Sequence, residues 1–223
     1  MYILNIHTAT ETAIVNLSAG GNALSTLINY ESKKHAAFLH IAINNLLQKE
    51  GISSKELKAV GVSSGPGSYT GIRVGLAAAK GLCYALNIPL IAYNSLELMA
   101  YTSLIETGNK DALYCPMIDA RRMEVYTAVY DYNRNEIVPP SALILTENSF
   151  EEILSEKKIC FSGDGSRKFK NLTKNRNSIF TEAEISTDSL AKISFEKFEK
   201  KEFENIFYSE PLYIKDFVTP GKQ

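Results

Sequence analysis

The sequence predicts a two-lobed α/β protein, and three observations support that prediction. Residues 2–30 form short apolar runs separated by turn residues, which is typical of an antiparallel meander. A glycine-rich loop at 64–68 then joins an apolar run to a long helix. After a polar stretch at 106–111 the strand pattern starts again, so both halves open with antiparallel strands.

Length and composition limit the class of protein. The chain has 223 residues and a formal net charge of −1, which excludes a basic field over the whole surface but leaves room for a local patch. Cys83, Cys115 and Cys160 lack metal or disulfide spacing, so we expect reduced, packed thiols in a cytoplasmic protein. The start lacks a signal-peptide pattern, and no apolar run reaches the roughly 18 residues that a membrane span needs.

The first half is expected to contain strands at 2–6, 12–17, 23–30 and 57–63. A helix is expected over 32–49, capped by Ser32 and ended by Gly51. Its apolar residues cover more than one stripe, so the helix is either deeply buried or faces a partner. His35 and His40 are five residues apart rather than four, which favours hydrogen-bonded histidines over a metal site.

The loop at 64–68 leads into a helix over 70–86, with Ser68 or Thr70 as its cap. A strand, a glycine loop and a helix start can hold an anion, because backbone amides and the helix dipole converge there. The alternative, which the residues favour, is a tight turn, since neither a Walker loop nor a Rossmann fingerprint is present. The residues of the anion-binding alternative are Thr8 and Thr10 in the hydroxyl-rich turn after the first strand, with Gly65, Gly67 and Ser68.

Small residues follow one face of this helix. Gly71, Gly75 and Ala79 are four residues apart, and two glycines in a helix indicate a packing demand. We interpret this stripe as a docking surface for a second helix. Arg73 lies on the polar line of the helix, which indicates either an ordinary solvated edge on a buried helix or a helix with two apolar contacts, one to its own sheet and one to a partner.

The second half is expected to continue with a strand at 90–93, a helix over 96–105 and a boundary at 106–111. Strands are expected at 112–118, 124–130, 143–145 and 159–161, with Val138–Pro140 in a connecting loop. Helices are expected over 147–154 and, exposed at the surface, over 188–203; the segment 210–215 is extended and 219–223 is a frayed tail. Between the strands at 112–118 and 124–130, Asp119, Arg121, Arg122 and Glu124 form a dense charge cluster, and we expect its acids and bases to pair with each other.

No catalytic apparatus is recognisable in the sequence. It contains no Ser-His-Asp signature of familiar local form, no zinc motif and no supported Cys-His pair. Nucleotide binding between two lobes is a natural function for such a shape, but fold does not fix function.

Several motifs resemble one family. The stretch at 65–76, GPGSYTGIRVGL, is similar to the GPGSFTGxRxG signature of the TsaB (YeaZ) family, and 117–126, MIDARRMEVY, is similar to its IDARxGEVY hairpin. The start at 1–10, the segment at Lys34 and His35, and EPLYIK at 210–215 resemble other anchors of that family in the same order. The resemblance therefore runs along nearly the whole chain, with little support between 135 and 188.

The resemblance implies an actin-like and Hsp70-like fold of the acetate and sugar kinase superfamily, with ribonuclease-H-type lobes at 1–106 and 107–223. The terminal segment is expected to pack back on the first lobe. It implies a non-catalytic chain, without metal or cofactor of its own, that pairs with the paralogous enzyme TsaD and the ATPase TsaE. ATP and metal belong to that complex, and tRNA is expected to be reached only through it. Homodimers are expected when TsaD is absent.

By the same resemblance the first two helices form the contact surface. Its expected residues are His35, Phe38, Leu39, Ala42, Ile43, Leu46, Gly71, Arg73, Val74, Gly75, Ala78, Ala79 and Leu82.

Three positions depart from the family pattern. His7 stands where the family has an aspartate that helps to organise metal and phosphate, which favours a non-catalytic role. Tyr69 replaces a phenylalanine, and Met123 replaces a glycine in the hairpin turn. The alternative is an autonomous ATP-dependent phosphotransferase or a peptidase of the same superfamily.

Overall fold

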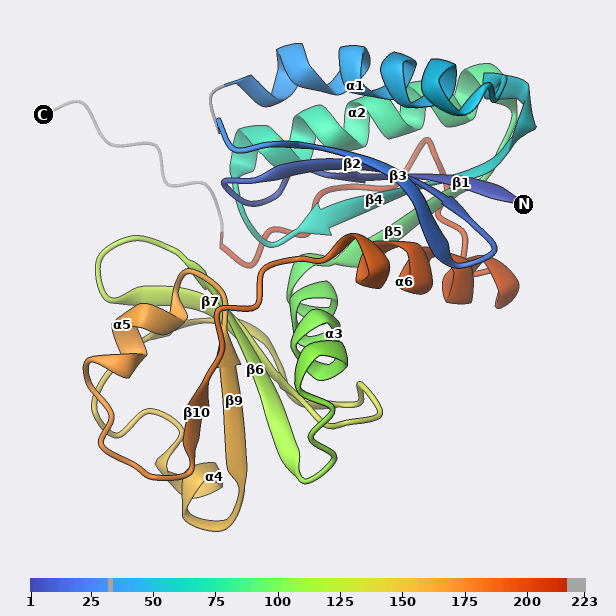
Figure 1. The fold of residues 1–223 in the computed structure, drawn as a ribbon. Coiled ribbons are helices and arrows are strands. Elements are labelled where there is room, and N and C mark those ends of the chain that lie inside the picture. Colours follow the sequence, from blue (N-terminus) through green and yellow to red (C-terminus); the bar gives the residue numbers. More distant parts are fainter. Residues whose placement is uncertain (32–33, 216–223) are drawn as a thin grey trace, which may run out of the picture.

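The computed structural model describes residues 1–31 and 34–215, which fold into two five-stranded mixed sheets, one above the other in Figure 1. The first sheet has the order β3-β2-β1-β4-β5 and the second has the order β10-β9-β6-β7-β8. The strands of the first sheet are β1 (Tyr2–His7), β2 (Ala13–Ala19), β3 (Asn22–Asn29), β4 (Leu57–Gly65) and β5 (Leu90–Asn94). Those of the second are β6 (Ala112–Asp119), β7 (Glu124–Tyr130), β8 (Glu136–Ile144), β9 (Lys158–Ser162) and β10 (Ser178–Phe180).

The two sheets share one topology. In each, the first strand pairs antiparallel with the second and parallel with the fourth, and the second strand pairs antiparallel with the third. The fifth strand adds parallel to the fourth in both. The duplicated, two-lobed α/β architecture predicted from the sequence is therefore confirmed.

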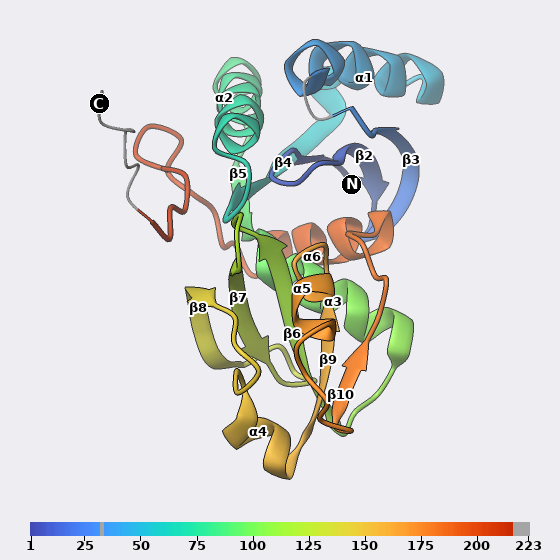
Figure 2. The ribbon, with the colours of Figure 1, turned by 90° about the vertical axis from the view of Figure 1, so that its left-hand side faces the viewer.

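Helices cover both faces of the first sheet. The helices are α1 (His35–Glu50), α2 (Tyr69–Leu86), α3 (Ser95–Thr107), α4 (Glu151–Glu156), α5 (Ser166–Lys170) and α6 (Thr187–Glu199), with a short 3-10 turn at Ser54–Glu56. In Figures 1 and 2, α1 and α2 lie on the outer side of the first sheet, and α3 and α6 lie between the sheets. Side chains alternate along a strand, so Leu4 and Ile6 pack under α1 and α2, whereas Ile3 packs toward α6. None of the described helices is long and apolar enough to cross a membrane.

The helix expected at the surface over 188–203 is a packing element. It is α6, which contacts β1, β2, β3 and β5 and buries Leu190, Ala191 and Ile193. Its lysines and glutamates occupy only the outer side, and the small inner residues let it approach the sheet. The expected lobes at 1–106 and 107–223 would assign α6 to the second lobe. In the structure α6 covers the sheet of the first lobe.

Several helices and strands of the second half lie at other positions than expected. Val138–Pro140 lies within β8 rather than in a loop, and the strand expected at 143–145 is the end of β8. Prolines are tolerated here because β8 is an edge strand and its pairing with β7 is irregular beside them. The helix expected over 147–154 begins later, at Glu151, after a left-handed Phe150. The short α5 and β10 were not predicted.

The helix ends follow the expected capping chemistry. The Ser68 hydroxyl accepts a hydrogen bond from the Gly71 amide, and Asn94 caps α3 in the same way through Leu96. Gly51 ends α1 in the left-handed conformation, with φ 66°. Ser32, the expected cap of α1, and the tail at 219–223 lie outside the described residues.

Residues 203–215, here called the C-terminal strap, run along one edge of α2. The Glu204 amide donates to Leu90 O at 2.8 Å, Lys80 Nζ donates to Ser209 O at 3.1 Å, and the Leu212 amide donates to Ser64 O at 2.8 Å. At its end, Lys215 forms an ion pair with Glu124 of the second sheet. The strap therefore contacts both lobes.

The stripe of Gly71, Gly75 and Ala79 faces the chain's own first sheet. A Cβ atom on Gly71 would lie 2.0 Å from Thr8 O, and one on Gly75 would lie 2.3 Å from Thr8 Oγ1. The Thr8 hydroxyl donates to Gly71 O at 2.7 Å, which fixes this close approach. The packing demand read from the sequence is real, but the structure assigns it to an intramolecular contact, so the stripe is not an exposed docking surface.

His7, at the end of β1, is fully buried within a chain of hydrogen bonds. Its Nε2 lies 2.9 Å from Thr10 Oγ1, and Thr10 donates to Thr12 O, so Nε2 carries the proton and donates. Nδ1 is then the acceptor for the Ser63 hydroxyl. Burial, and secondarily the nearby His35, lower the pKa of His7 to about 3, so the imidazole is neutral at pH 7.

We predict opposite effects for the same substitution at two glycines of α2. Gly71→Ala should lower the free energy of unfolding by about 2–3 kcal/mol, because its Cβ would have to displace backbone at Thr8. Gly81→Ala meets no atom within 4 Å and should raise it by up to about 1 kcal/mol through helix propensity. Urea unfolding of both variants checks this. Equal changes in unfolding free energy for the two variants would contradict the inward orientation of Gly71 and the outward orientation of Gly81.

Acid should destabilise the fold through His7. An unfolded histidine has a pKa of about 6.5, so between about pH 6.5 and 3 the unfolded chain binds a proton that the folded chain excludes. Stability is therefore retained above about pH 6.5 and lost as the pH falls, by about 2 kcal/mol between pH 7 and pH 5.

The measurement is urea unfolding of wild type and His7→Gln at both pH values. The variant should be less stable at pH 7 but should lose about 2 kcal/mol less on acidification. His40→Gln, at an exposed position of α1, controls for the removal of a histidine as such. If His7→Gln loses as much unfolding free energy between pH 7 and pH 5 as wild type does, His7 does not cause the pH dependence.

Candidate functional site

The outer face of α2, which points away from the first sheet, carries a row of small apolar residues, whereas the outer face of α1 mixes apolar side chains with polar ones such as His40 and Asn44. On α2 the exposed positions include Ala77, Gly81 and Ala85, with Val74 and Ala78 half-buried beside them. On α1, Ala37 is exposed and Ile41 is 64% exposed. Single exposed apolar residues are ordinary, whereas a contiguous exposed apolar patch is typical of an interaction surface. Figure 1 shows both helices on the outside of the molecule.

The structure divides the interface residues predicted from the sequence. Most of the α1 set belongs to the chain's own core, because Leu39, Ala42, Ile43 and Leu46 pack on the first sheet. The wide apolar face of α1 is explained largely by that core. Gly71, Gly75 and Ala79 are buried in the same way, whereas Val74, Ala78, Leu82 and Phe38 remain partly exposed.

The two polar members of that set have partners within the chain. His35 is buried and its Nε2 donates to Thr10 O at 3.1 Å, with Asn29 on its Nδ1. This is the hydrogen-bonded histidine that its spacing from His40 favours. Arg73 is exposed, and its Nε donates to the Tyr213 hydroxyl of the strap at 2.7 Å.

A groove runs between the C-terminal part of α1 and α2. Its lining includes His40, Asn44 and Leu47 of α1, Leu82 of α2, and the turn from Gly51 to Ser54. The groove is a depression in the outer face. A helix that packs across this face could place side chains in it. We use the outer face of α1 and α2, with this groove, as the candidate docking surface.

The sequence missed the members of this surface that matter most. Ala77, Gly81 and Ala85 also follow a helical spacing, so the pattern contains two small-residue faces on one helix. Periodicity alone does not say which face turns inward. The wide spread of small residues around α2 was the available signal.

The glycine loop is closed from both sides by the chain itself. A Cβ on Gly67 would lie 2.0 Å from Ala9 O, and one on Gly65 would lie 2.7 Å from Leu212 O of the strap. The Ser68 amide donates to Ala9 O at 2.7 Å, and the Ser68 hydroxyl accepts a hydrogen bond from the Gly71 amide. With Thr8 and Thr10 also bonded internally, the geometry supports the tight turn rather than the phosphate cradle.

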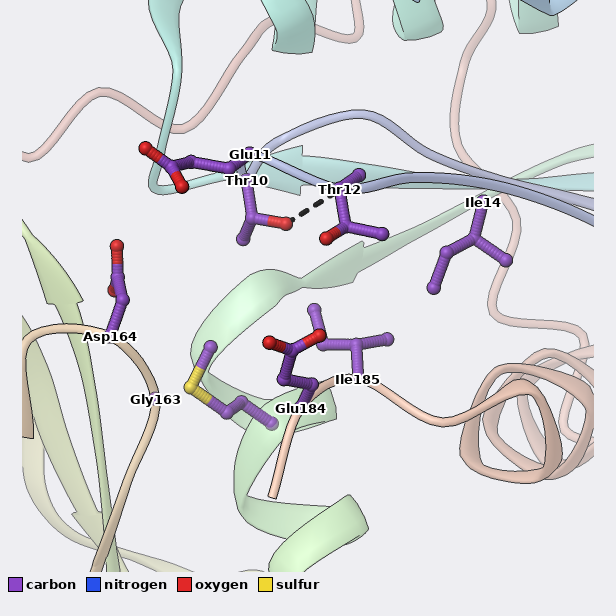
Figure 3. Close-up of a pocket in the computed structure, with 9 residues that line it drawn as sticks. Thr10, Glu11, Thr12, Ile14, Gly163, Asp164, Glu184 and Ile185 are labelled. Carbon is purple, nitrogen blue, oxygen red and sulfur yellow. Dashed lines mark hydrogen bonds between the residues drawn. The ribbon is translucent and has the colours of Figure 1, made fainter. Parts of the chain in front are cut away.

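A small cavity lies between the lobes (Figure 3). Its volume is about 90 Å³, and three carboxylates line it, from Glu11, Asp164 and Glu184. Asp164 Oδ1 accepts from the amides of Asp119 and Gly165, while burial raises the pKa of this carboxyl. None of the nine residues drawn around the cavity in Figure 3 is a lysine or an arginine.

This cavity does not fit a nucleotide, which the fold class would place between the lobes. Ligand pockets usually measure about 300–1,000 Å³, and triphosphates need cationic or amide partners. The acidic lining instead repels phosphate, and buried His7 offers no charge in place of a metal-binding acid. Within residues 1–31 and 34–215, no group of three His, Cys, Asp or Glu side chains is arranged to hold a metal ion.

Comparison with known proteins connects this geometry to a family. A family model described as TsaD, tRNA N6-adenosine threonylcarbamoyltransferase, matches residues 29–216. The tRNA threonylcarbamoyladenosine biosynthesis protein TsaB of Bacillus subtilis is 34% identical over 160 residues, which cover 70% of this chain and 67% of that protein. The Escherichia coli TsaB is 27% identical over 237 residues and covers 100% of both chains.

Solved structures agree in fold. A Pseudomonas aeruginosa protein described as similar to peptidase YeaZ superposes with a TM-score of 0.83 at 23% identity, over 96% of this chain and 99% of that one. A putative N-acetylmannosamine kinase of Listeria monocytogenes matches with a TM-score of 0.50 at 10% identity, over 91% and 100%. The actin-like fold class with two lobes of one topology, expected from the resemblance, is thereby confirmed. The chain belongs to the TsaB (YeaZ) family.

Proposed function

We propose that this chain is a non-catalytic partner and activator of a TsaD-type enzyme in tRNA threonylcarbamoyladenosine biosynthesis. In this proposal the enzyme carries the chemistry and modifies the adenosine next to the anticodon, in the cytoplasm, with TsaE as the ATPase of the complex. This chain docks on the enzyme through the outer face of α1 and α2. It binds no metal or nucleotide of its own, and it forms a homodimer through the same face when the enzyme is absent.

The observation that carries the proposal is the outer face itself. Ala77, Gly81 and Ala85 leave the backbone of α2 open to close approach, and Ile41 provides an exposed, large apolar side chain on α1. Small residues on one helix allow a partner helix to pack with short interaxial distance. The relatives named TsaB, and the family model named for TsaD, suggest a paralogous enzyme as the partner.

The alternative of an autonomous kinase or peptidase has less support. The glycine loop is filled by Ala9 and Leu212, the cavity between the lobes is small and acidic, and His7 is neutral. Calorimetry of the isolated chain with Mg-ATP tests it directly. Binding with turnover would revive the kinase alternative and remove the non-catalytic assignment.

Gly81→Arg should abolish the complex while leaving the fold intact. A side chain at Gly81 meets no atom within 4 Å in the free chain, so the arginine fits the monomer but fills the space that a partner helix would occupy. The experiment is co-expression with the TsaD paralogue of the same organism, followed by affinity purification and urea unfolding of the free variant. We expect loss of co-purification with an unfolding midpoint no lower than that of wild type.

Ser155→Arg is the matched control. It adds the same side chain to exposed α4, at the far end of the molecule from α1 and α2 (Figure 1). It should bind the enzyme as wild type does. A complex that survives Gly81→Arg would rule out this face as the docking surface.

A further inference from the structure

The hairpin between β6 and β7 presents two consecutive arginines to solvent. Arg121 and Arg122 are both exposed and both have positive φ, 72° and 51°. The turn is closed by hydrogen bonds from the Ala120 amide to Glu124 O and from the Glu124 amide to Arg121 O, each 3.1 Å. The backbone of this tip is thus well defined, and both side chains project from it.

The acids beside these arginines are paired with lysines from distant elements. The sequence predicted that the charges of this turn pair with each other. Instead Asp119 binds Lys168 at 2.6 Å, and Glu124 binds Lys215 of the strap. Among the described residues, neither arginine side chain forms an ion pair within 4.0 Å. Two lysines neutralise the local carboxylates, and the two arginines remain available for an external anion.

The strap joins this hairpin to the start of α2. Two residues before Lys215, the Tyr213 ring stacks on Tyr69 with centroids 5.2 Å apart. The Arg73 guanidinium lies 3.9 Å from the centroid of Tyr69 and donates to the Tyr213 hydroxyl. Cations and partly exposed aromatic rings therefore follow one another along a single path, which we call the cationic band: Arg73, Arg121, Arg122, Lys168 and Lys215, with Tyr69 and Tyr213.

We infer that the cationic band binds the phosphate backbone of RNA directly, so that this chain is itself part of the tRNA-binding surface. The inference rests on the proposed function and deepens it. Arginine forks match phosphate oxygens. The Tyr69 ring, which packs against Tyr213 and Arg73, holds the Arg73 guanidinium in place at the surface. The sequence left room for a local basic patch despite the net charge of −1, and the resemblance placed tRNA contact only in the complex as a whole.

The position of the band agrees with an RNA ligand. Its α2 end borders the candidate docking surface, so RNA on the band would also reach the bound enzyme. Its hairpin end borders the acidic cavity, because the Asp119 amide donates to Asp164. The carboxylates of Glu11, Asp164 and Glu184 repel phosphate, which keeps the RNA on the outer surface and out of the cleft.

The test is binding of an unmodified tRNA transcript to the heterodimer with the TsaD paralogue, across a salt series. The double variant Arg121→Gln with Arg122→Gln should weaken binding by about tenfold at low salt. It should also reduce the slope of log K against log salt by about 2, one for each lost phosphate contact. Lys157→Gln with Lys158→Gln removes the same charge from an exposed pair next to α4 and should leave both quantities unchanged.

The outcomes separate the proposals. If the arginine variant binds tRNA as wild type does, or if the lysine variant weakens binding equally, the band is not an RNA site. If the arginine variant fails to co-purify with the enzyme, the hairpin is a protein contact and the inference is overturned. Specific displacement of tRNA by ATP or inorganic phosphate, beyond the effect of ionic strength, would assign the arginines to a free phosphate compound instead. Loss of pairing in Gly81→Arg bears on the proposed function alone.

Discussion

The close approach of α2 to the end of β1 determines most of what this molecule presents to its surroundings. Thr8 lies in the gap above Gly71 and Gly75, where a Cβ on either glycine would be within 2.3 Å of its oxygen atoms. This contact fixes the rotation of α2 about its own axis. One small-residue face is thereby used within the chain, and the opposite face, with Ala77 and Gly81, is left outward. The same contact closes the glycine loop, because the turn that enters α2 must pack on Ala9.

A second consequence concerns chemistry. The end of the first strand and the glycine loop at 64–68 form their hydrogen bonds and close contacts within the chain. His7 is held neutral between Ser63 and Thr10, and the loop at Gly65 is covered by the strap. These groups are part of the internal packing of the chain. The outer face of α1 and α2 and the hairpin arginines lie outside this packing and are exposed.

The sequence was sufficient to predict the architecture, but it did not show which face of a helix turns inward or which charged side chains pair. Alternation and turn residues predicted most strands, and capping residues such as Ser68 and Gly51 marked helix ends, because these signals are local. The direction in which a small-residue stripe faces is not local, since it depends on which strand end lies above it. The same limit applies to Asp119 and Glu124. Their neighbours in sequence were arginines, but their partners are Lys168 and Lys215, which lie 49 and 91 residues further along the chain.

The strap shows why the ion pairs of the hairpin matter beyond their own energy. Pairs that are partly exposed contribute about 1 kcal/mol or less each to stability, so Lys215 and Lys168 are not needed to hold the two lobes together. Buried side chains of α3 and α6 do that. What the lysines change is the charge that the hairpin tip shows to solvent, because each occupies a carboxylate that would otherwise attract an arginine. Geometry within the chain thus leaves Arg121 and Arg122 with positive charge that an outside anion can neutralise.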